Sequence, residues 1–302
     1  MRYLITGTNG FIGRSLVAKI SEDINNHIFA IDLSLDTIPD APNITKIPTD
    51  LLKIDGSNFP EVDVVIHAAA LLGVDFVENN PIRTVLDNIS MFGPLTKYLA
   101  NNKVRFVFFS TSEAYGDGRR KEGAGILQNL ENNASLPLNL PNLFDSRSSY
   151  PISKIVGEFL SNQSANSLCL RPHNIYGSQM GTRHVMPQLI DKINKAKSGD
   201  LIPMYNPQHV RSFCYIDDAI DQIIYWINSN ETGPVNIGNP SEPVKIESLF
   251  KMTAKIMNKE VIMDVKTEHL TSPHYRKPKI DYDGFTFTSL TEGLEIMIRS
   301  YS

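Results

Sequence analysis

The sequence has few cysteines, no net positive charge and no long hydrophobic run, and each absence excludes a class of protein. Cys169 and Cys214 are the only cysteines among 302 residues. They are too few for a disulfide framework or a thiolate metal site, and they fit two buried thiols in a reducing compartment. The formal net charge of −4 provides no global basic field, so we expect neither nucleic acid nor an anionic membrane as a partner. No group of His, Asp and Glu residues has metal-ligand spacing, so we expect no metal.

Segments typical of membrane insertion or secretion are also missing. No stretch reaches the roughly 18 consecutive apolar residues of a membrane span. The first residues, MRYLITGTNGFIG, enter a strand pattern directly and show no charged region followed by an apolar one. We therefore expect a soluble cytoplasmic protein, in which any anionic ligand is held by a local site.

Apolar runs that read as strands alternate with segments of helical periodicity through the first two thirds of the chain. The strand-like runs are RYLIT, IFAID, DVVIHAAA, VRFVFFS and SLCLRP, and the helical segments span 12–20, 82–101 and 151–164. This alternation predicts an α/β fold, a doubly wound parallel sheet with helices on both faces.

A glycine-rich turn follows the first of these strands. The run LITGTNGFIG places Gly7, Gly10 and Gly13 at GxxGxxG spacing, between a predicted strand and a predicted helix. Such glycines allow a tight turn and a close approach of backbone N–H groups to a pyrophosphate. The next strand ends in Asp32, whose carboxylate can bind the adenosine ribose and would repel a 2′-phosphate. This pattern predicts a Rossmann dinucleotide site that prefers NAD to NADP. Ordinary turn glycines and a solvated aspartate are the alternative.

The alternation of strand-like and helical segments ends near residue 172, where short segments interrupted by Pro and Gly indicate loops and a smaller lobe. An amphipathic stretch at 217–228 and a strand-like run at 233–238 favour a return to the first domain. We predict an NAD-binding Rossmann domain over 1–171, rejoined by 211–238, and a substrate-binding lobe over 172–210 and 239–302. The irregular segment 117–149 fits a lid and a surface excursion equally well.

Tyr150 and Lys154, in SSYPISK, are four residues apart on a predicted helix, which places both side chains on one face. A nearby ammonium and a positive nicotinamide favour the lowered tyrosine pKa that a base at neutral pH needs. Tyr275 and Lys279 repeat the spacing, but Pro278 argues against a helix there. The context therefore favours Tyr150.

These motifs together resemble the extended short-chain dehydrogenase/reductase family, within it the nucleotide-sugar epimerases, dehydratases and decarboxylases. The resemblance covers nearly the whole chain and rests on GTNGFIG, HAAA at 67–70, Asn88, STSEAYG at 110–116, YPISK, RPHNIYG at 171–177, RSFCYIDDA at 211–219, NIG at 236–238 and SPHYRKPKID at 272–281. It implies NAD as the cofactor, a nucleotide-diphosphate sugar as the substrate, and a homodimer that pairs through the helices at 82–101 and 151–164.

The resemblance also implies residue roles. In such enzymes the tyrosine takes the proton of the sugar 4-hydroxyl while a hydride leaves C4 for NAD. This role falls to Tyr150, with Lys154 on the nicotinamide ribose and Thr111 on the same hydroxyl. Further implied cofactor contacts, besides the three glycines and Asp32, are Asn9, Phe11, Ile12, Asp50, Leu51, Ala68, Ala69, Ala70, Asn88 and Ser110. Asp50 fits a turn or a helix cap equally well.

In this family, enzymes that catalyse different reactions differ in the residues at the positions of Ser112 and Glu113. A 4-keto sugar acidifies the C5 hydrogen, so a carboxylate such as Glu113 can start elimination at C6. A C6 carboxylate would instead be lost as carbon dioxide. The 4,6-dehydratases carry an acidic residue where this chain has Ser112, and RKPKID is more similar to epimerases and decarboxylases.

The sequence thus favours C4 epimerisation. Decarboxylation or 4,6-dehydration through Glu113 and a net 4-dehydrogenase are the alternative reactions. Glu113 as a buried partner of a neighbouring loop is the structural alternative, and a dinucleotide-sensing scaffold without chemistry is the alternative for the whole chain.

Asn174, Arg211 and Arg276 match positions that contact the nucleotide diphosphate in this family, where the planar fork of arginine suits phosphate oxygens. Surface ion pairs are the alternative for both arginines. The segment YNPQHVR departs from the glycine-rich pattern that precedes this arginine in the family. His67, at a strand end, favours packing over catalysis.

Overall fold

The computed structural model describes residues 1–116, 119–122, 126–129, 133–135, 138, 142–182, 184–266 and 274–301, without the side chains of 101, 119–122 and 126–129. The chain divides into two compact units. The first comprises Met1–Ala114, Leu138–Pro172 and Ile220–Val235, and the second comprises Tyr115–Pro137, His173–Ala219 and Asn236–Ser302. Within the described ranges, no helix has both the length and the apolar character needed to cross a bilayer.

A seven-stranded sheet forms the centre of the first unit. Its strands in spatial order are β13 (Gly233–Ile237), β8 (Ser167–Pro172), β5 (Arg105–Phe109), β4 (Val64–His67), β1 (Arg2–Thr6), β2 (His27–Asp32) and β3 (Ile44–Pro48). All neighbours from β8 to β3 run parallel. The chain order reverses between β1 and β4, which is where doubly wound sheets bind ligands.

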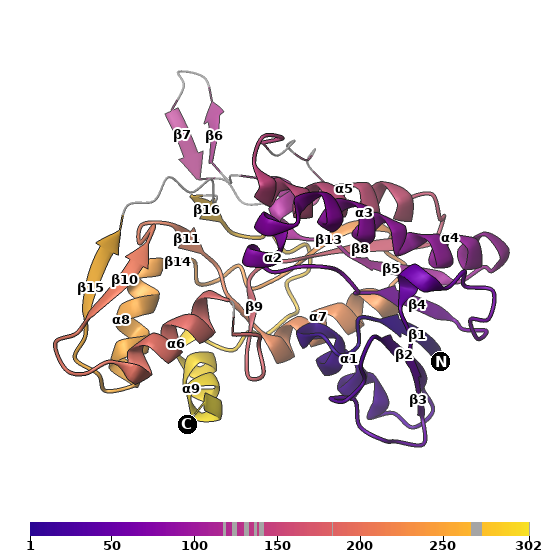
Figure 1. The fold of residues 1–302 in the computed structure, drawn as a ribbon, viewed down its shortest axis with the longest axis horizontal. Helices are drawn as coiled ribbons and strands as arrows, with labels where there is room; N and C mark the ends of the chain where they lie inside the picture. Colours follow the sequence, from indigo (N-terminus) through magenta and orange to yellow (C-terminus); the bar gives the residue numbers. More distant parts are fainter. Residues whose placement is uncertain are drawn as a thin grey trace. The chain divides into compact units, whose positions relative to one another are not determined.

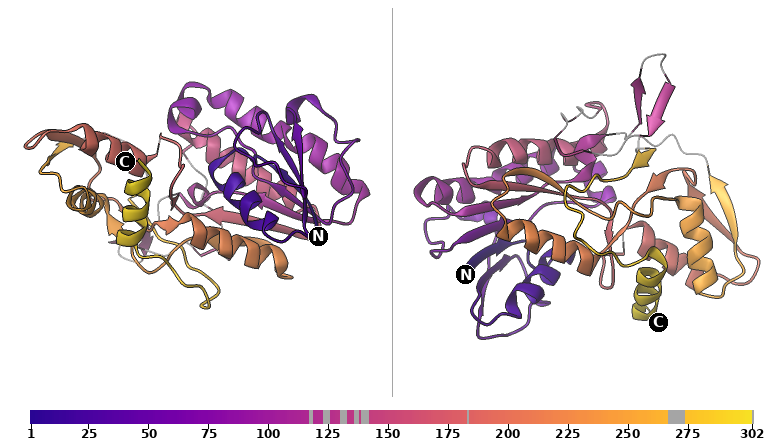
Figure 2. Two further views of the ribbon diagram at one scale, coloured as in Figure 1. Left: turned by 90° about the horizontal axis from the view of Figure 1, so that it is seen from below. Right: turned by 180° about the vertical axis from the view of Figure 1, so that it is seen from behind.

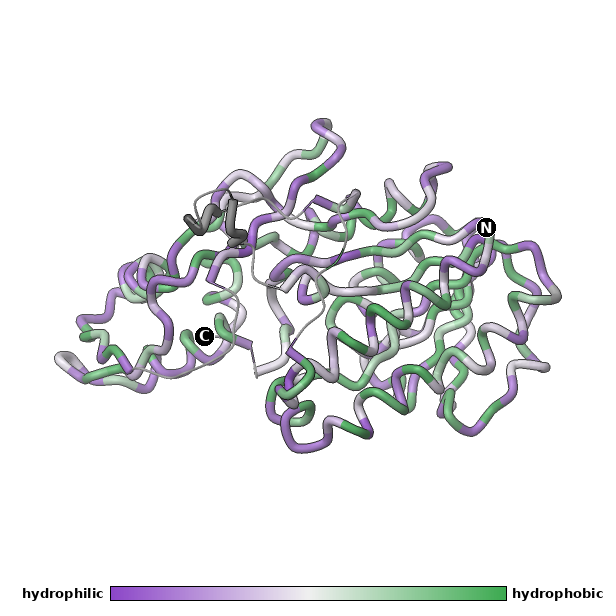
Figure 3. The backbone as a smooth tube through the Cα atoms, turned by 90° about the horizontal axis from the view of Figure 1, so that it is seen from above, coloured by the Kyte–Doolittle hydropathy of each residue, from purple (hydrophilic) through white to green (hydrophobic). Residues whose placement is uncertain are grey.

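Helices cover both faces of this sheet. Figure 1 shows α3 (Pro81–Ser90), α4 (Phe92–Asn101) and α5 (Ser149–Ser161) on one face, and α1 (Phe11–Ser21) and α7 (Ile216–Asn228) on the other. The views in Figure 2 show the same layers. The helices in Figure 3 alternate between green and purple along their turns, because each buries one side. The predicted doubly wound α/β fold is confirmed.

The middle strands carry the core. Leu4, Val65 and Phe106, from β1, β4 and β5, are at most 1% exposed and pack in one cluster with Leu95 of α4. Uninterrupted apolar runs suit strands that are covered on both faces. Gly157 lets α5 lie close on β5, because a Cβ there would be 2.4 Å from Cζ of Phe108.

Two expectations about local structure need correction. The single helix predicted over 82–101 is two helices, since α3 ends at Ser90 and α4 begins at Phe92. Pro94 has no N–H to donate to the carbonyl of Ser90, so one continuous helix would lose a hydrogen bond there. The segment 117–149 is also less irregular than predicted, because β6 (Arg119–Glu122) and β7 (Ile126–Asn129) form an antiparallel pair. The rest of its first half lies largely outside the described residues, and a lid function stays a prediction.

The second unit is built from small sheets and three longer helices. Besides the β6–β7 pair, its described elements include β9 (Ile175–Tyr176), α6 (Val185–Lys195), β10 (Leu201–Tyr205), β11 (Val210–Arg211), β12 (Cys214–Tyr215), β14 (Val244–Lys245), α8 (Ile246–Ile256), β15 (Ile262–Lys266), β16 (Tyr275–Arg276) and α9 (Leu290–Tyr301). β10 pairs with β15, β12 pairs with β9, and β11 lies between β14 and β16. Gly293 allows α9 to pack on the buried Tyr176, because a Cβ there would be 2.0 Å from the phenol oxygen. The binding roles predicted for the two domains stay predictions.

Candidate active site

The residues predicted to hold a dinucleotide collect at the carboxyl edge of the sheet, because parallel strands end at the same edge. Gly7 follows β1 with φ +76°, and a Cβ there would lie 2.5 Å from the backbone N of Ala69, which follows β4. A Cβ on Gly13 would lie 2.1 Å from the carbonyl oxygen of Gly7. These two glycines are therefore required by the close packing of β1, α1 and β4 themselves.

The start of α1 and the end of β2 fit a dinucleotide. Gly10 is the N-cap of α1 and provides no side-chain cap, so N–H groups at Phe11 and Ile12 suit an anion such as a diphosphate. The Asp32 carboxylate accepts the N–H of Asn9 at 2.9 Å and that of Leu33 at 2.7 Å. It is thus held at the strand end, where a ribose hydroxyl could reach it.

The other predicted cofactor residues have protein partners. The carboxylate of Asp50 accepts the N–H of Leu52 at 3.0 Å, which is a cap, and Leu51 is buried. The backbone N–H groups of Ala68 and Ala69 bond to Thr6, and Ala70 continues that segment. A cofactor contact of these residues stays a prediction.

Asn88 holds neighbouring segments together. Its Oδ1 accepts the N–H of Leu71 at 2.7 Å, and its Nδ2 donates to the Leu71 carbonyl at 3.1 Å and to Oγ of Ser153 at 3.0 Å. The Ser153 hydroxyl donates in turn to the carbonyl of Tyr150 at 2.7 Å. Asn88 thereby fixes the first turn of α5, and its predicted cofactor contact is untested.

The structure brings Tyr150, Lys154 and Thr111 together. Tyr150 lies in the first turn of α5, and Nζ of Lys154 is 5.8 Å from the centroid of its ring. The same Nζ donates to the carbonyl of Phe109, at the end of β5, at 2.7 Å. Thr111, two residues further on, hydrogen-bonds the Tyr150 phenol. The other Tyr–Lys pair lacks this geometry, because Tyr275 lies in the strand β16 and Pro278 follows.

Burial dominates the electrostatics of this cluster. It raises the pKa of the Tyr150 phenol, the Glu113 carboxylate raises that pKa further, and the hydrogen bond with Thr111 lowers it. Burial also lowers the pKa of Lys154 to about 7. The protein alone therefore keeps the phenol protonated. The downward shift predicted for Tyr150 needs the positive charge of a bound nicotinamide.

Glu113 differs from its neighbours in being exposed. It lies in the 3₁₀ turn η2 (Ser112–Tyr115), between the buried Ser112 and Ala114, and its N–H donates to Oγ1 of Thr111 at 3.2 Å. Among the described residues, none donates a hydrogen bond to its carboxylate or forms an ion pair with it. The structural alternative, a buried partner of a loop, does not fit this position.

His67 is a packing residue, as its sequence position favoured. Its ring is 1% exposed, its Nδ1 lies 2.7 Å from Oγ1 of Thr6, and it contacts the rings of Phe92 and Phe108. Burial lowers the pKa of His67 to about 3, so the ring is neutral at the pH of an assay.

The predicted diphosphate contacts lie together in the second unit. Arg211 and Arg276 are partners in the parallel β11–β16 ladder, so their Cα atoms lie about 4.8 Å apart and their side chains share a face. Arg276 is buried, whereas Arg211 is partly exposed and donates to the Val210 carbonyl at 2.8 Å. Nδ2 of Asn174 donates to the carbonyl of Ser212, next to Arg211, at 2.9 Å. Two arginines at paired strand positions suit a diphosphate, and this contact stays a proposal.

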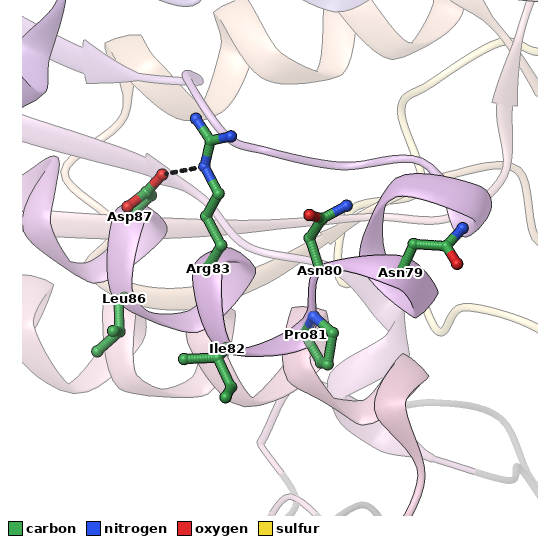
Figure 4. A pocket seen from close by; sticks show the side chains of 7 residues that line it. All are labelled: Asn79, Asn80, Pro81, Ile82, Arg83, Leu86 and Asp87. Carbon is green, nitrogen blue, oxygen red and sulfur yellow. Dashed lines mark hydrogen bonds and ion pairs between the residues drawn. The ribbon is translucent and has the colours of Figure 1, made fainter.

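A pocket of about 440 Å³ lies elsewhere on the first unit, and it is lined by Asn79, Asn80, Pro81, Ile82, Arg83, Leu86 and Asp87. In Figure 4, Ile82 and Leu86 project from one side of α3, while Arg83 pairs with Asp87 at 2.9 Å on another. None of the predicted cofactor or catalytic residues lines it. Most of its lining residues are on α3, which is part of the segment predicted to pair two copies of the chain.

Two buried charged residues behind the site were missed. Glu158 of α5 and Arg171 of β8 form an ion pair at 2.6 Å. The sequence contains a weak indication that Glu158 is buried. It lies four residues after Lys154, which lies four residues after Tyr150, so all three side chains share one face of the helix. That Arg171 is its partner follows only from the packing of α5 on the sheet.

The sequence profile of the NAD dependent epimerase/dehydratase family matches residues 3–238. The chain belongs to this family. NAD, the cofactor predicted from the sequence, is the cofactor in the family's description.

Similar relatives include UDP-glucuronic acid decarboxylase 3 of Arabidopsis thaliana, 28% identical over 295 residues that cover 93% of this chain and 81% of the relative. UDP-glucuronic acid decarboxylase 1 of Danio rerio is 26% identical, covering 92% and 66%.

Solved structures of nucleotide-sugar enzymes share the fold. UDP-glucuronic acid 4-epimerase from Bacillus cereus, in complex with UDP-glucuronic acid and NAD, superposes with a TM-score of 0.82 at 24% identity, covering 99% of this chain and 98% of that one. The NDP-hexosamine 5,6-dehydratase TunA gives a TM-score of 0.82 at 19% identity, covering 100% and 97%. At these identities the likeness establishes the fold and leaves the reaction open.

The lowered pKa of Lys154 predicts a pH-dependent stability in the cofactor-free protein. Between about pH 7 and the ordinary value of 10.5, the unfolded chain binds a proton at Lys154 that the folded chain does not, so stability rises with pH. We expect Lys154→Met to remove this part of the rise in the free energy of unfolding. Urea titrations at several pH values in this window test it, with the exposed Lys53→Met as the control. Parallel curves for wild type and Lys154→Met would contradict the shift.

Proposed function

We propose that this protein is an NAD-dependent nucleotide-sugar decarboxylase, which oxidises C4 of a nucleotide-linked glucuronic acid and releases its C6 as carbon dioxide. The observation that carries the proposal is the exposed Glu113 carboxylate close to the Tyr150 phenol, whose pKa it raises. The decarboxylases among the similar relatives support this choice. The sequence favoured C4 epimerisation, which needs no acid at this position.

Oxidation at C4 is the step that Tyr150 serves. Its phenolate accepts the proton of the C4 hydroxyl, and Thr111 hydrogen-bonds the Tyr150 oxygen and orients it. Lys154, held by the Phe109 carbonyl, lies beside the ring and favours the phenolate when it is protonated. NAD, when bound, would supply a reversible hydride acceptor: the hydride that leaves C4 would return to C4 after carbon dioxide has left, which gives a pentose with no net use of NAD.

Glu113 serves the step that follows. A ketone at C4 makes the C6 carboxylate a β-keto acid, so the C5–C6 bond breaks, carbon dioxide leaves, and the electron pair passes into the enolate of C4 and C5. We assign Glu113 to pass a proton from solvent to C5. Its exposure lets water reprotonate it. In the second unit, Arg211, Arg276 and Asn174 are proposed to hold the diphosphate.

Release of carbon dioxide from UDP-glucuronic acid by the NAD-loaded protein tests this assignment. We expect Tyr150→Phe to lower turnover by roughly 100- to 10,000-fold, as for the loss of a general base. Glu113→Gln should still reduce bound NAD but form pentose slowly. Tyr225→Phe, which removes a phenol from α7, is the matched control. Full turnover by Tyr150→Phe, or unchanged pentose formation by Glu113→Gln, would contradict the roles assigned to these two residues.

We also propose that two copies pair through α3 and α5. Ile82 and Leu86 on α3 are 75% and 58% exposed, and Phe159 on α5 is 65% exposed, although these helices pack together. Exposed apolar side chains gathered on neighbouring helices are typical of an interface. Light scattering should give a dimer mass for the wild type and for Ile24→Lys, and a monomer mass for Ile82→Lys/Leu86→Lys. A monomeric wild type at micromolar concentration would sink the proposal.

A further inference from the structure

Directly behind the predicted catalytic residues, the first unit buries a second polar cluster. Glu158 of α5 accepts two hydrogen bonds from Arg171 of β8, from Nε to Oε1 at 2.8 Å and from Nη2 to Oε2 at 2.6 Å. The two side chains are 8% and 4% exposed. Ser110, the first residue after β5, donates its hydroxyl to the same Oε1 at 2.5 Å. This cluster joins three elements of the unit.

The cluster adjoins the predicted catalytic residues on α5 and in the segment after β5. Lys154 precedes Glu158 by one helical turn, and its Nζ donates to the carbonyl of Phe109 at 2.7 Å. The N–H of the next residue, Ser110, donates to the carbonyl of Leu170 in β8 at 2.7 Å. Two consecutive residues at the end of β5 are therefore bonded to α5, and the second is also bonded to β8. Thr111, Ser112 and Glu113 follow at once in the chain.

Stability alone does not account for this pair. Replacing a buried ion pair with apolar side chains of similar volume is often neutral or stabilising, because the pair must overcome the desolvation of two charges. The pair does fix geometry, since a bidentate arginine–carboxylate contact has one favoured orientation. Gly157 leaves α5 no spare distance from Phe108. The helix therefore cannot come closer to β5 at this point, and the bidentate pair with Arg171 of β8 sets its register along the sheet.

We infer that Glu158, together with Arg171 and Ser110, is a positioning residue of the active site. It holds α5, which carries Tyr150 and Lys154, in register with the segment 110–113, which carries Thr111 and Glu113. Catalysis needs both halves together, because a misplacement of about 1 Å can lower a rate on the order of 100-fold. The inference deepens the proposed function and rests on it for its kinetic consequence.

The test replaces both members of the pair, because either single replacement leaves a buried charge without its partner. We expect Glu158→Met/Arg171→Met to fold with a melting temperature close to that of the wild type. Its kcat for decarboxylation should fall on the order of 100-fold, with the KM for the nucleotide sugar unchanged. Lys97→Met/Asp55→Met removes an exposed pair of 2.8 Å from the same unit and should leave kcat unchanged.

Hydrogen exchange in the cofactor-free protein provides a readout that does not depend on activity. Backbone amides at 110–113 should exchange faster in the double variant, whereas those of β1 and β2 should not change. Unchanged kcat together with unchanged exchange at 110–113 would overturn the inference. A wild type that releases no carbon dioxide would refute the proposed function, and the exchange experiment would still decide the positioning role.

Ser110→Ala covers the case in which the double variant does not fold. It keeps the ion pair and removes only the hydrogen bond from the end of β5 to Glu158. We expect faster exchange at 110–113 without a general loss of protection. Unchanged exchange in this variant would count against the inference.

Discussion

Helix α5 has to bury charged side chains against an apolar sheet, and the arrangement of the site depends on how it does so. Lys154 and Glu158 both lie on its buried side. Lys154 donates a hydrogen bond to the carbonyl of Phe109, and Glu158 accepts hydrogen bonds from Arg171 and Ser110. Buried charges are tolerated only with such partners. The partners are the carboxyl ends of β5 and β8, so α5 has one position on the sheet.

With α5 in this position, Tyr150 and Glu113 lie close to each other in different environments. Removal of the Tyr150 phenol from water raises its pKa, whereas Glu113, soon after β5, has an exposed side chain between buried neighbours. Two titratable groups in unlike surroundings can take unlike roles, one as the base for a hydroxyl and the other as a proton donor that exchanges with water. An epimerase needs only the first role, whereas a decarboxylase uses both groups.

Much of this arrangement could be predicted from the sequence. The strands are visible as continuous apolar runs, the turn before α1 as Gly7, Gly10 and Gly13, and the proximity of Tyr150 and Lys154 as a four-residue spacing on a helix. These features are local, because each is set by neighbours within a turn or a strand.

Features that depend on tertiary contacts could not be predicted. Glu158 meets Arg171 only because α5 packs on β8. Arg211 and Arg276 are 65 positions apart, and only the β11–β16 register makes them neighbours. The amide of Asn88 matched a cofactor position in the family, but its hydrogen bonds go to Leu71 and Ser153. The exposure of Glu113 was likewise not encoded locally, because the residues on both sides of it are buried.

Oxidation at C4 is proposed to lead to chemistry at C5 and C6, and the products made in heavy water test this most directly. The measurement is proton NMR of the products formed from UDP-glucuronic acid in D2O by the NAD-loaded protein. We expect a nucleotide-linked pentose that carries one solvent deuterium at C5, because the exposed Glu113 exchanges its proton with water before it protonates C5. A C4-epimerised hexuronic acid without deuterium at C5 would contradict the proposed decarboxylation, and would establish plain epimerisation.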